Sequence, residues 1–187
     1  MCDVSPKFFL LGTAIALLST STLVFGAPAA EQSYIARFGG TWAGNATVIK
    51  NSVPWQVDCR VDGSASLGRI LIQGDCRMLM VTVPIAADIT YDPASGRYSG
   101  TYIGSDVGPA RVSGRRHGSV VDLVISWPKV IHGDDQARMK IQNAGAGRLS
   151  ISTFDNVVTG GPEIRTSNAA LALTSPAFAA TDPDQAH

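Results

Sequence analysis

No charge of either sign dominates this sequence. Its 187 residues contain 15 basic and 15 acidic side chains, and 16% of the residues are charged. Nucleic acids and anionic lipid surfaces select for basic patches on their protein partners. The neutral balance therefore argues against nucleic acid, and against anionic lipid, as the main partner of the protein.

The residue patterns of common catalytic centres are missing too. Serine is plentiful, but no Gly-x-Ser-x-Gly elbow occurs, and a nucleophile of that kind needs a base held in place by a third group. There are just three histidines, and His187 is the last residue. We therefore predict no catalytic residue and no cofactor, and we favour a non-catalytic protein over an enzyme.

Long apolar runs are confined to the N-terminus. Phe8–Val24 carries no charged side chain, Lys7 precedes it, and small residues follow it. A charged start, an apolar middle and a small-residue end are typical of a secretory signal peptide. We predict that residues 1–29 are this signal peptide, cleaved after Gly26 or Ala29, and that the mature protein is periplasmic or secreted. The alternative is an uncleaved membrane anchor, for which a run of about 17 residues is short.

The sequence has only three cysteines, and the predicted signal peptide contains one of them. Cys2 precedes the apolar run and would be lost with the signal peptide, whereas Cys59 and Cys76 stay in the mature chain. A cysteine pair in an oxidising compartment is typical of a disulfide. We predict a Cys59–Cys76 disulfide that stabilises the fold by about 3 kcal/mol in the chain-entropy model. Two buried free thiols are the alternative.

The mature sequence is rich in β-strand signals. Nearly every segment alternates with period two, is rich in Val, Ile, Thr, Tyr and Trp, and is bounded by Gly, Pro, Asn or Asp. The alternation is clearest at 121–127 and 136–142, and no window of the sequence shows a convincing helical stripe. The expected strands are Gly40–Lys50, Pro54–Val61, Arg69–Gly74, Met78–Tyr91, Arg97–Gly104, Ala110–Arg115, Val120–Trp127, Gln136–Asn143, Arg148–Phe154 and Glu163–Leu173.

Short turns connect these strands. Asp92–Gly96, for example, supplies a proline with a preset φ and a glycine that tolerates positive φ. Strands joined in this way make a meander, and closing the meander hides its edges. We therefore predict an all-β fold, an antiparallel up-and-down β-barrel of about eight to ten strands, with a β-sandwich as the alternative. The single barrel domain would span residues 38–174, followed by a disordered tail at 175–187.

Four short features stand out along the mature chain. They are Gly40-Thr41-Trp42, the Cys59 and Cys76 pair, Ser99-Gly100-Thr101-Tyr102 and Val112-Ser113-Gly114-Arg115. In this order they resemble an uncharacterised family of small exported proteins from alphaproteobacteria. The resemblance covers most of the mature chain and implies export and a β fold, but it implies no activity.

The opening Gly-x-Trp strand is also similar to that of the avidin and lipocalin barrels, in which the tryptophan plugs one barrel end. Three later strings follow in the order seen in avidins: Tyr98–Tyr102, Ser113–Arg115 and Ile125–Trp127. The set of tryptophans around the avidin ligand is not reproduced, since the chain has three tryptophans. This resemblance implies a lipocalin/avidin-like barrel and no particular ligand.

Five aromatic residues are candidates for lining a cavity inside such a barrel. They are Trp42, Trp55, Tyr98, Tyr102 and Trp127. Small barrels are just wide enough to be filled by side chains or to hold one small ligand. The alternative interpretation is that all five residues fill the core.

The polar cluster of His132, Asp134 and Asp135 is a weak candidate for a metal site, because imidazole and carboxylate are ordinary ligands. No second His or Cys stands at ligand spacing, so our prediction is no metal, with an exposed turn as the alternative role for this cluster. Arg115, Arg116 and His117 could likewise bind an anion or form a solvated hairpin tip.

These observations rank three functions. The leading hypothesis is a non-catalytic periplasmic or secreted β-barrel module that binds a small ligand or an envelope protein, with no membrane insertion of the mature chain. The second is a structural or interaction protein of the envelope with a filled core. The third is a metal-dependent enzyme that uses the His132–Asp135 loop.

Overall fold

The computed structural model describes residues 28–104 and 107–177. They form one short helix, α1 (Ala29–Ala36), and ten strands. The strands are β1 (Gly40–Lys50), β2 (Val53–Ser66), β3 (Arg69–Met78), β4 (Val81–Asp92), β5 (Arg97–Ile103), β6 (Ala110–His117), β7 (Val120–Ile131), β8 (Asp134–Gly145), β9 (Arg148–Asn156) and β10 (Glu163–Pro176). Most of the predicted signal peptide and tail lies outside the described residues.

The strands form a closed antiparallel barrel. Each strand pairs with its neighbours in sequence, and β1 also pairs with β10, so the sheet closes on itself. The prediction of an all-β, up-and-down barrel is therefore confirmed in preference to the β-sandwich. The Asp92–Gly96 turn joins β4 to β5, where Asp92 Oδ1 accepts a hydrogen bond of 3.0 Å from the Ala94 N–H.

The core follows from the period-two alternation of the strands. On β7, Val121, Leu123 and Ile125 are each at most 2% exposed, and on β8 the side chains of Met139 and Ile141 are also buried. Successive side chains of a strand point to opposite faces, so one face of each strand fills the barrel and the other meets solvent. The sequence pattern therefore encodes which face of the sheet is the inside.

The helix α1 was not predicted. Its eight residues bury Glu31, Tyr34 and Ile35, and no side chain caps its first turn. Isolated helices this short are marginal in water, so tertiary contacts must supply their stability. A search for a helical stripe cannot find such an element, because its stability lies in what it touches.

The turn between β3 and β4 also differs from the prediction, which placed it inside a strand beginning at Met78. Met78 pairs with Val81, so Leu79 and Met80 form the turn, and Leu79 has a φ of 52°. A positive φ is uncommon for leucine, and turns usually use Gly, Asn or Asp. The apolar side chains therefore hid the turn within an apparently continuous strand.

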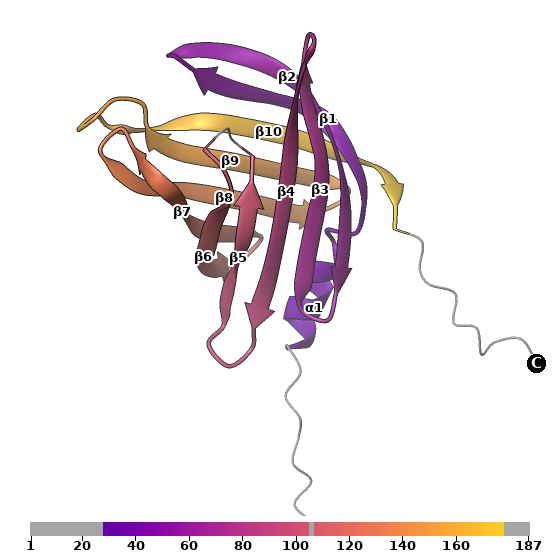
Figure 1. Cartoon of the computed structure of the whole chain (residues 1–187). Helices are drawn as coiled ribbons and strands as arrows, with labels where there is room; N and C mark the ends of the chain where they lie inside the picture. Colours follow the sequence, from indigo (N-terminus) through magenta and orange to yellow (C-terminus); the bar gives the residue numbers. More distant parts are fainter. Residues whose placement is uncertain (1–27, 105–106, 178–187) are drawn as a thin grey trace, which may run out of the picture.

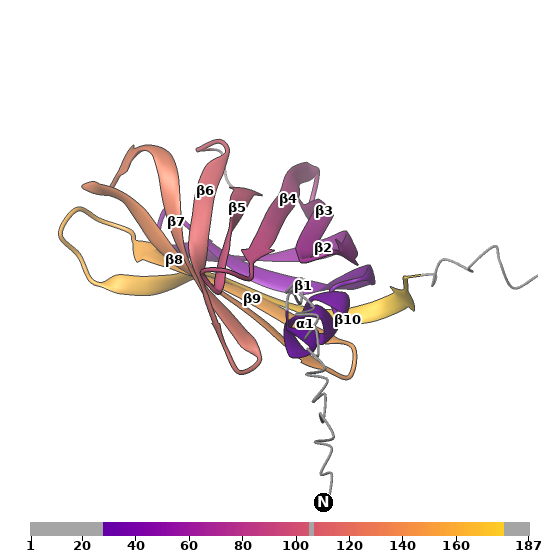
Figure 2. The ribbon, with the colours of Figure 1, turned by 90° about the horizontal axis from the view of Figure 1, so that it is seen from below.

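The barrel has two different ends. The helix α1 packs at the end formed by the β2–β3, β4–β5, β6–β7 and β8–β9 connections, which we call the closed end. The other alternate connections, from β1–β2 to β9–β10, form the opposite end, which we call the open end. Figure 1 shows α1 below the barrel and the β3–β4 tip at the top, and Figure 2 shows α1 from below.

Candidate ligand site at the open end of the barrel

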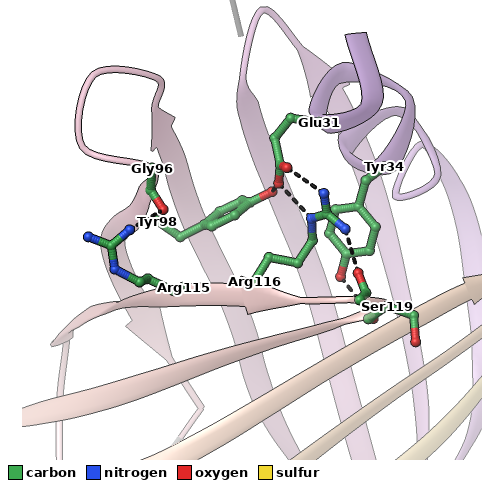
Figure 3. A network of polar contacts seen from close by, with 8 residues as sticks. Glu31, Tyr34, Gly96, Tyr98, Arg115, Arg116 and Ser119 are labelled. Atoms are coloured by element: carbon green, nitrogen blue, oxygen red, sulfur yellow. Dashed lines mark hydrogen bonds and ion pairs between the residues drawn. The ribbon is translucent and has the colours of Figure 1, made fainter. Parts of the chain in front are cut away.

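A partly buried ion pair fastens α1 to the closed end. The Glu31 carboxylate accepts hydrogen bonds from Arg116, at 2.8 Å from Nε and 2.5 Å from the second guanidinium nitrogen, and from the Tyr98 hydroxyl. The Arg116 guanidinium also lies 4.6 Å from the centre of the Tyr34 ring. Figure 3 shows the carboxylate between the two donors. The pair therefore joins the helix to β5 and β6.

The electrostatics of this pair keep both partners charged. The hydrogen bond from Arg116 is the main cause that lowers the pKa of Glu31, and the same bond raises the pKa of Arg116. Burial raises the pKa of Tyr34 to about 12, and burial together with Glu31 raises that of Tyr98. The tyrosines stay neutral donors, so the arrangement suits a structural anchor and supplies no group that titrates near neutral pH.

Further contacts fill the closed end. The Trp42 indole N–H donates to the Phe38 carbonyl at 3.0 Å, and Asn143 Nδ2 donates to the Arg37 carbonyl at 3.0 Å. The predicted site residues Trp42 and Tyr98 lie here, 1% and 0% exposed. Arg116, which the sequence offered as a possible anion ligand, is occupied by Glu31. A long-range partner of this kind cannot be read from local spacing.

The inner face of the barrel is exposed at the open end. On β2, Cys59 and Val61 are buried, whereas Val53 and Trp55, on the same face, are 49% and 41% exposed. On β4, the same change along one face leaves Val81 and Val83 at 54% and 38% exposure, although Ala87 and Ile89 are buried. The inside of the barrel therefore changes from packed to open along two strands.

The change in exposure follows from where the strand pairing stops. Pairing between β2 and β3 ends at Asp58↔Arg77, and pairing between β4 and β5 ends at Ala86↔Ile103. Beyond these points β2 pairs only with β1, and β4 pairs only with β3, although β1 itself stays paired with β10 as far as Val48. We call these parts of the β1–β2 and β3–β4 hairpins the two arms. Figure 1 shows the two arms diverging above the barrel.

The disulfide lies where the two arms separate. Cys59 and Cys76 are directly opposite each other on β2 and β3, one residue pair from the last pairing of these strands, and they are bonded. The predicted disulfide is confirmed. Its position ties the base of one arm to the base of the other.

Two further predicted aromatic residues lie toward the open end. Tyr102 on β5 and Trp127 on β7 have ring centres 6.4 Å apart. The Trp127 indole nitrogen is buried and has no hydrogen-bond partner among the described residues. A buried donor without a partner costs about 1–3 kcal/mol, so it is a favourable place for an acceptor from a ligand.

The carboxyl group of Asp155 has a raised pKa in these surroundings. Burial is the main cause that raises the pKa of Asp155 on β9, and the nearby Trp127 indole opposes it without reaching hydrogen-bond geometry. Burial also raises the pKa of the Tyr102 hydroxyl to about 12. Tyr102 and Trp127 therefore lie together, with the Trp127 N–H as a polar group, whereas Trp55, on the exposed end of β2, makes no ring contact with either of them among the described residues.

The weak metal candidates lie at the β7–β8 turn. His132 is in the turn itself, with a φ of 52°, and Asp134 Oδ1 accepts from the Gln136 N–H at 3.0 Å. Across residues 28–104 and 107–177, no three His, Cys, Asp or Glu side chains come together in a way that could hold a metal ion. The same described residues contain no helix long and apolar enough to cross a membrane.

A cleft of about 260 Å³ lies beside this turn, toward the outside of the barrel. Within it, Arg138 pairs with Glu163 at 2.8 Å and lies over the Phe154 ring, so its charge is already balanced. The cleft is lined by Val124, Asp134, Gln136, Ala137, Arg138, Phe154, Asp155, Asn156 and Glu163.

No protein-family model and no curated protein matches this chain. Among solved structures, the chain is similar to that of Rv2717c from M. tuberculosis, with a TM-score of 0.57 and 15% identity, over 78% of this chain and 98% of that chain. A likeness at this identity shows the barrel fold alone. It gives no support to the resemblance to alphaproteobacterial proteins, since the matched structure comes from another group of bacteria.

Proposed function

We propose that this protein is a non-catalytic, exported β-barrel module that binds a small molecule at its open end. The observation that carries the proposal is the exposure of apolar side chains on the inner face of the barrel, at Val53, Trp55, Val81 and Val83. The closed end of the same inner face is packed. A protein with a purely structural barrel would be expected to bury this face as well.

The chemistry of the residues favours an amphipathic ligand. Binding sites for small molecules are mostly apolar, with a few polar groups that fix orientation. Here the apolar walls come from the two arms, and Tyr102 and Trp127 supply aromatic surface below them. The unpartnered Trp127 N–H would donate a hydrogen bond to a carbonyl, hydroxyl or carboxylate oxygen of the ligand. A protein of the envelope is the second candidate occupant, because an apolar surface of this kind also suits a protein partner.

Native mass spectrometry of protein purified gently from the periplasm tests the proposal. We expect a discrete extra mass that is lost on denaturation. The Val83→Ser variant should lose the ligand, because Val83 is an exposed valine on the inner face. Val124→Ser is the matched control, because Val124 has a similar exposure of 43% but lies on the outer face of β7. Equal ligand retention by both variants would place the ligand elsewhere.

The Trp127→Phe variant tests the polar contact separately. It keeps an aromatic ring beside Tyr102 and removes the indole N–H. We expect the affinity for an acceptor-bearing ligand to fall by about tenfold, the size of one hydrogen bond of about 1.4 kcal/mol, with little change for a purely apolar dye. Calorimetry or fluorescence titration gives both affinities. An equal loss for both compounds would show that ring packing, not the N–H, is what matters.

A further inference from the structure

Asp155 lies on the inner face of β9, toward the open end of the barrel. Along this strand Leu149 is buried and Ile151 packs against the core, so the alternation places Asp155 on the same face. Phe154 lies on the other face, where the Arg138 guanidinium is 5.1 Å from the centre of its ring. Charged side chains are seldom placed on an inner face unless they are paired. The position of this carboxylate therefore calls for a partner.

The Trp127 indole approaches the same place from β7. The register of β8 and β9 sets Ala137 beside Asp155, and on its other side Ala137 pairs with Ile125 of β7. Asp155 is thus two strand spacings, about 10 Å, from Ile125, and β8 places just a methyl group between them. Trp127 occupies the next inner position of β7, and its indole crosses this gap, because it interacts with the Asp155 carboxyl group.

Both polar groups have capacity for a further hydrogen bond. The Trp127 N–H is buried without a partner among the described residues. Asp155 Oδ1 accepts from the Asn156 backbone N–H at 2.7 Å, and no ion pair of the described part of the chain includes Asp155. Burial raises the pKa of this carboxyl group, and the Asn156 N–H and the Trp127 indole lower it. The charges of Asp134 and His132 have smaller effects of opposite sign on the same pKa.

Polar side chains deeper on the inner face satisfy each other instead. Thr153, two residues before Asp155 and therefore on the same face, shares a hydrogen bond of 2.6 Å with the Ser167 hydroxyl of β10. Each of these hydroxyl groups has a partner within the protein. The Trp127 donor and the Asp155 carboxylate are left available to a ligand that enters from the open end.

We propose that Trp127 and Asp155 together select an uncharged ligand that carries a hydroxyl group. A hydroxyl oxygen accepts a hydrogen bond from the Trp127 N–H, and the hydroxyl hydrogen is donated to Asp155, so one group satisfies both residues. A carboxylate or phosphate group would bring a second negative charge beside Asp155. An ammonium group pairs with Asp155 but has no acceptor for Trp127. The inference rests on the proposed function and narrows its ligand to an amphipathic alcohol.

Calorimetry with compounds that differ only in the polar group tests this selection. The processed protein is titrated with 1-octanol, octanoate and octylammonium at pH 8, where Asp155 is ionised. We expect 1-octanol to bind at least about tenfold more tightly than octanoate, the effect of about one pKa unit from a neighbouring like charge. Octylammonium should bind more weakly than 1-octanol, since it leaves the Trp127 N–H without an acceptor.

A matched pair of variants separates Asp155 from the general charge of the open end. D155N keeps the shape and an acceptor oxygen but removes the charge. It should bind octanoate at least about tenfold more tightly than the unchanged protein does, and it should keep its affinity for 1-octanol. D134N is the control, because Asp134 is an exposed carboxylate that lines the cleft outside the barrel. It should leave both affinities nearly unchanged. Damage to the fold would not produce a gain of affinity for one compound.

Three results would overturn the inference and leave the proposed function standing. The first is binding of octanoate by the unchanged protein that is as tight as binding of 1-octanol. The second is an equal gain of octanoate affinity in D155N and D134N, which would assign the effect to overall charge. The third is tighter binding of octylammonium than of 1-octanol, which would indicate an amine ligand. Absence of binding by all three compounds, with no extra mass in the native spectrum, would overturn the proposed function itself and the inference with it.

Discussion

The closed and open ends of the barrel are built from the same ten strands, but the inner face of the sheet is packed at the closed end and exposed at the open end. At the closed end, Trp42 and Tyr98 are buried under α1, and a partly buried ion pair fastens the helix. At the open end, Trp55 and Val81 occupy equivalent inward positions and are exposed. Period-two alternation therefore decides which face of a strand is inside, while pairing and covering elements decide whether the inside is packed.

The largest expected difference between the ends is in tryptophan truncation. Trp42→Ala removes a fully buried ring and its hydrogen bond to Phe38, so it should lower the free energy of unfolding by about 3–5 kcal/mol. Trp55→Ala removes a half-exposed ring and should cost about 1 kcal/mol or less. Denaturant unfolding measures both values. Similar losses would mean that the open end is packed in solution.

The disulfide gives the next largest effect. Replacing Cys59 and Cys76 by serine should lower the free energy of unfolding by about 3 kcal/mol, because the bridge restricts the unfolded chain. We also expect faster amide hydrogen exchange in the β1–β2 and β3–β4 arms than elsewhere, since the bridge joins their bases. Uniformly faster exchange, including the strands under α1, would show that the bridge does not act on the open end in particular.

The ion pair at the closed end should show its contribution through pH. Glu31→Gln should destabilise the protein by about 1.5–3 kcal/mol near neutral pH, the range for a hydrogen bond to a charged group. The pKa of Glu31 is lowered in the folded state, so its stabilising effect is present above its unfolded pKa of about 4.3 and is lost as the pH falls through the folded pKa. The difference between the two proteins should therefore shrink in acid. A difference that is independent of pH from 7 to 3 would contradict this assignment.

The smallest expected effect comes from replacing valine by threonine at one position in β2 and at one position in β4. Val61→Thr places a hydroxyl in the packed half and should cost about 1–2 kcal/mol, whereas Val83→Thr in the exposed half should stay within about 0.5 kcal/mol. Thermal unfolding with both variants in one buffer resolves the difference. An equal loss of stability at Val83 and at Val61 would show that the two halves of the barrel are packed alike.

Much of the fold could be predicted from the sequence because the information is local. The alternation at 121–127 and the proline and glycine of the Asp92–Gly96 turn each specify structure within a few residues, and they lead to a meander of the right kind. The disulfide could be predicted because just two cysteines remain after the apolar run. Each of these features can be predicted from a single segment or from the number of cysteines.

The candidate site could be predicted only in part, because it depends on where pairing ends. Five aromatic residues were expected inside the barrel, but local pattern cannot tell Trp42, under the helix, from Trp55, on an open arm. The partner of Arg116 is 85 residues away in the sequence, on a helix whose stability comes from that contact. The apolar turn at Leu79 and Met80 was read as strand because its side chains resemble those of a strand.

The contacts of α1 have a consequence for the order in which the molecule is assembled. Its Tyr34 hydroxyl donates to the Ser119 carbonyl, Arg37 contacts Asn143, and β1 pairs with β10 at the other end of the sequence. Segments near the start of the described residues thus have partners that are made much later. Contacts of such long sequence separation slow folding. The barrel can therefore close only after β10 has been made and brought to β1, and until then β1 is an unpaired edge that is open to pairing with another chain.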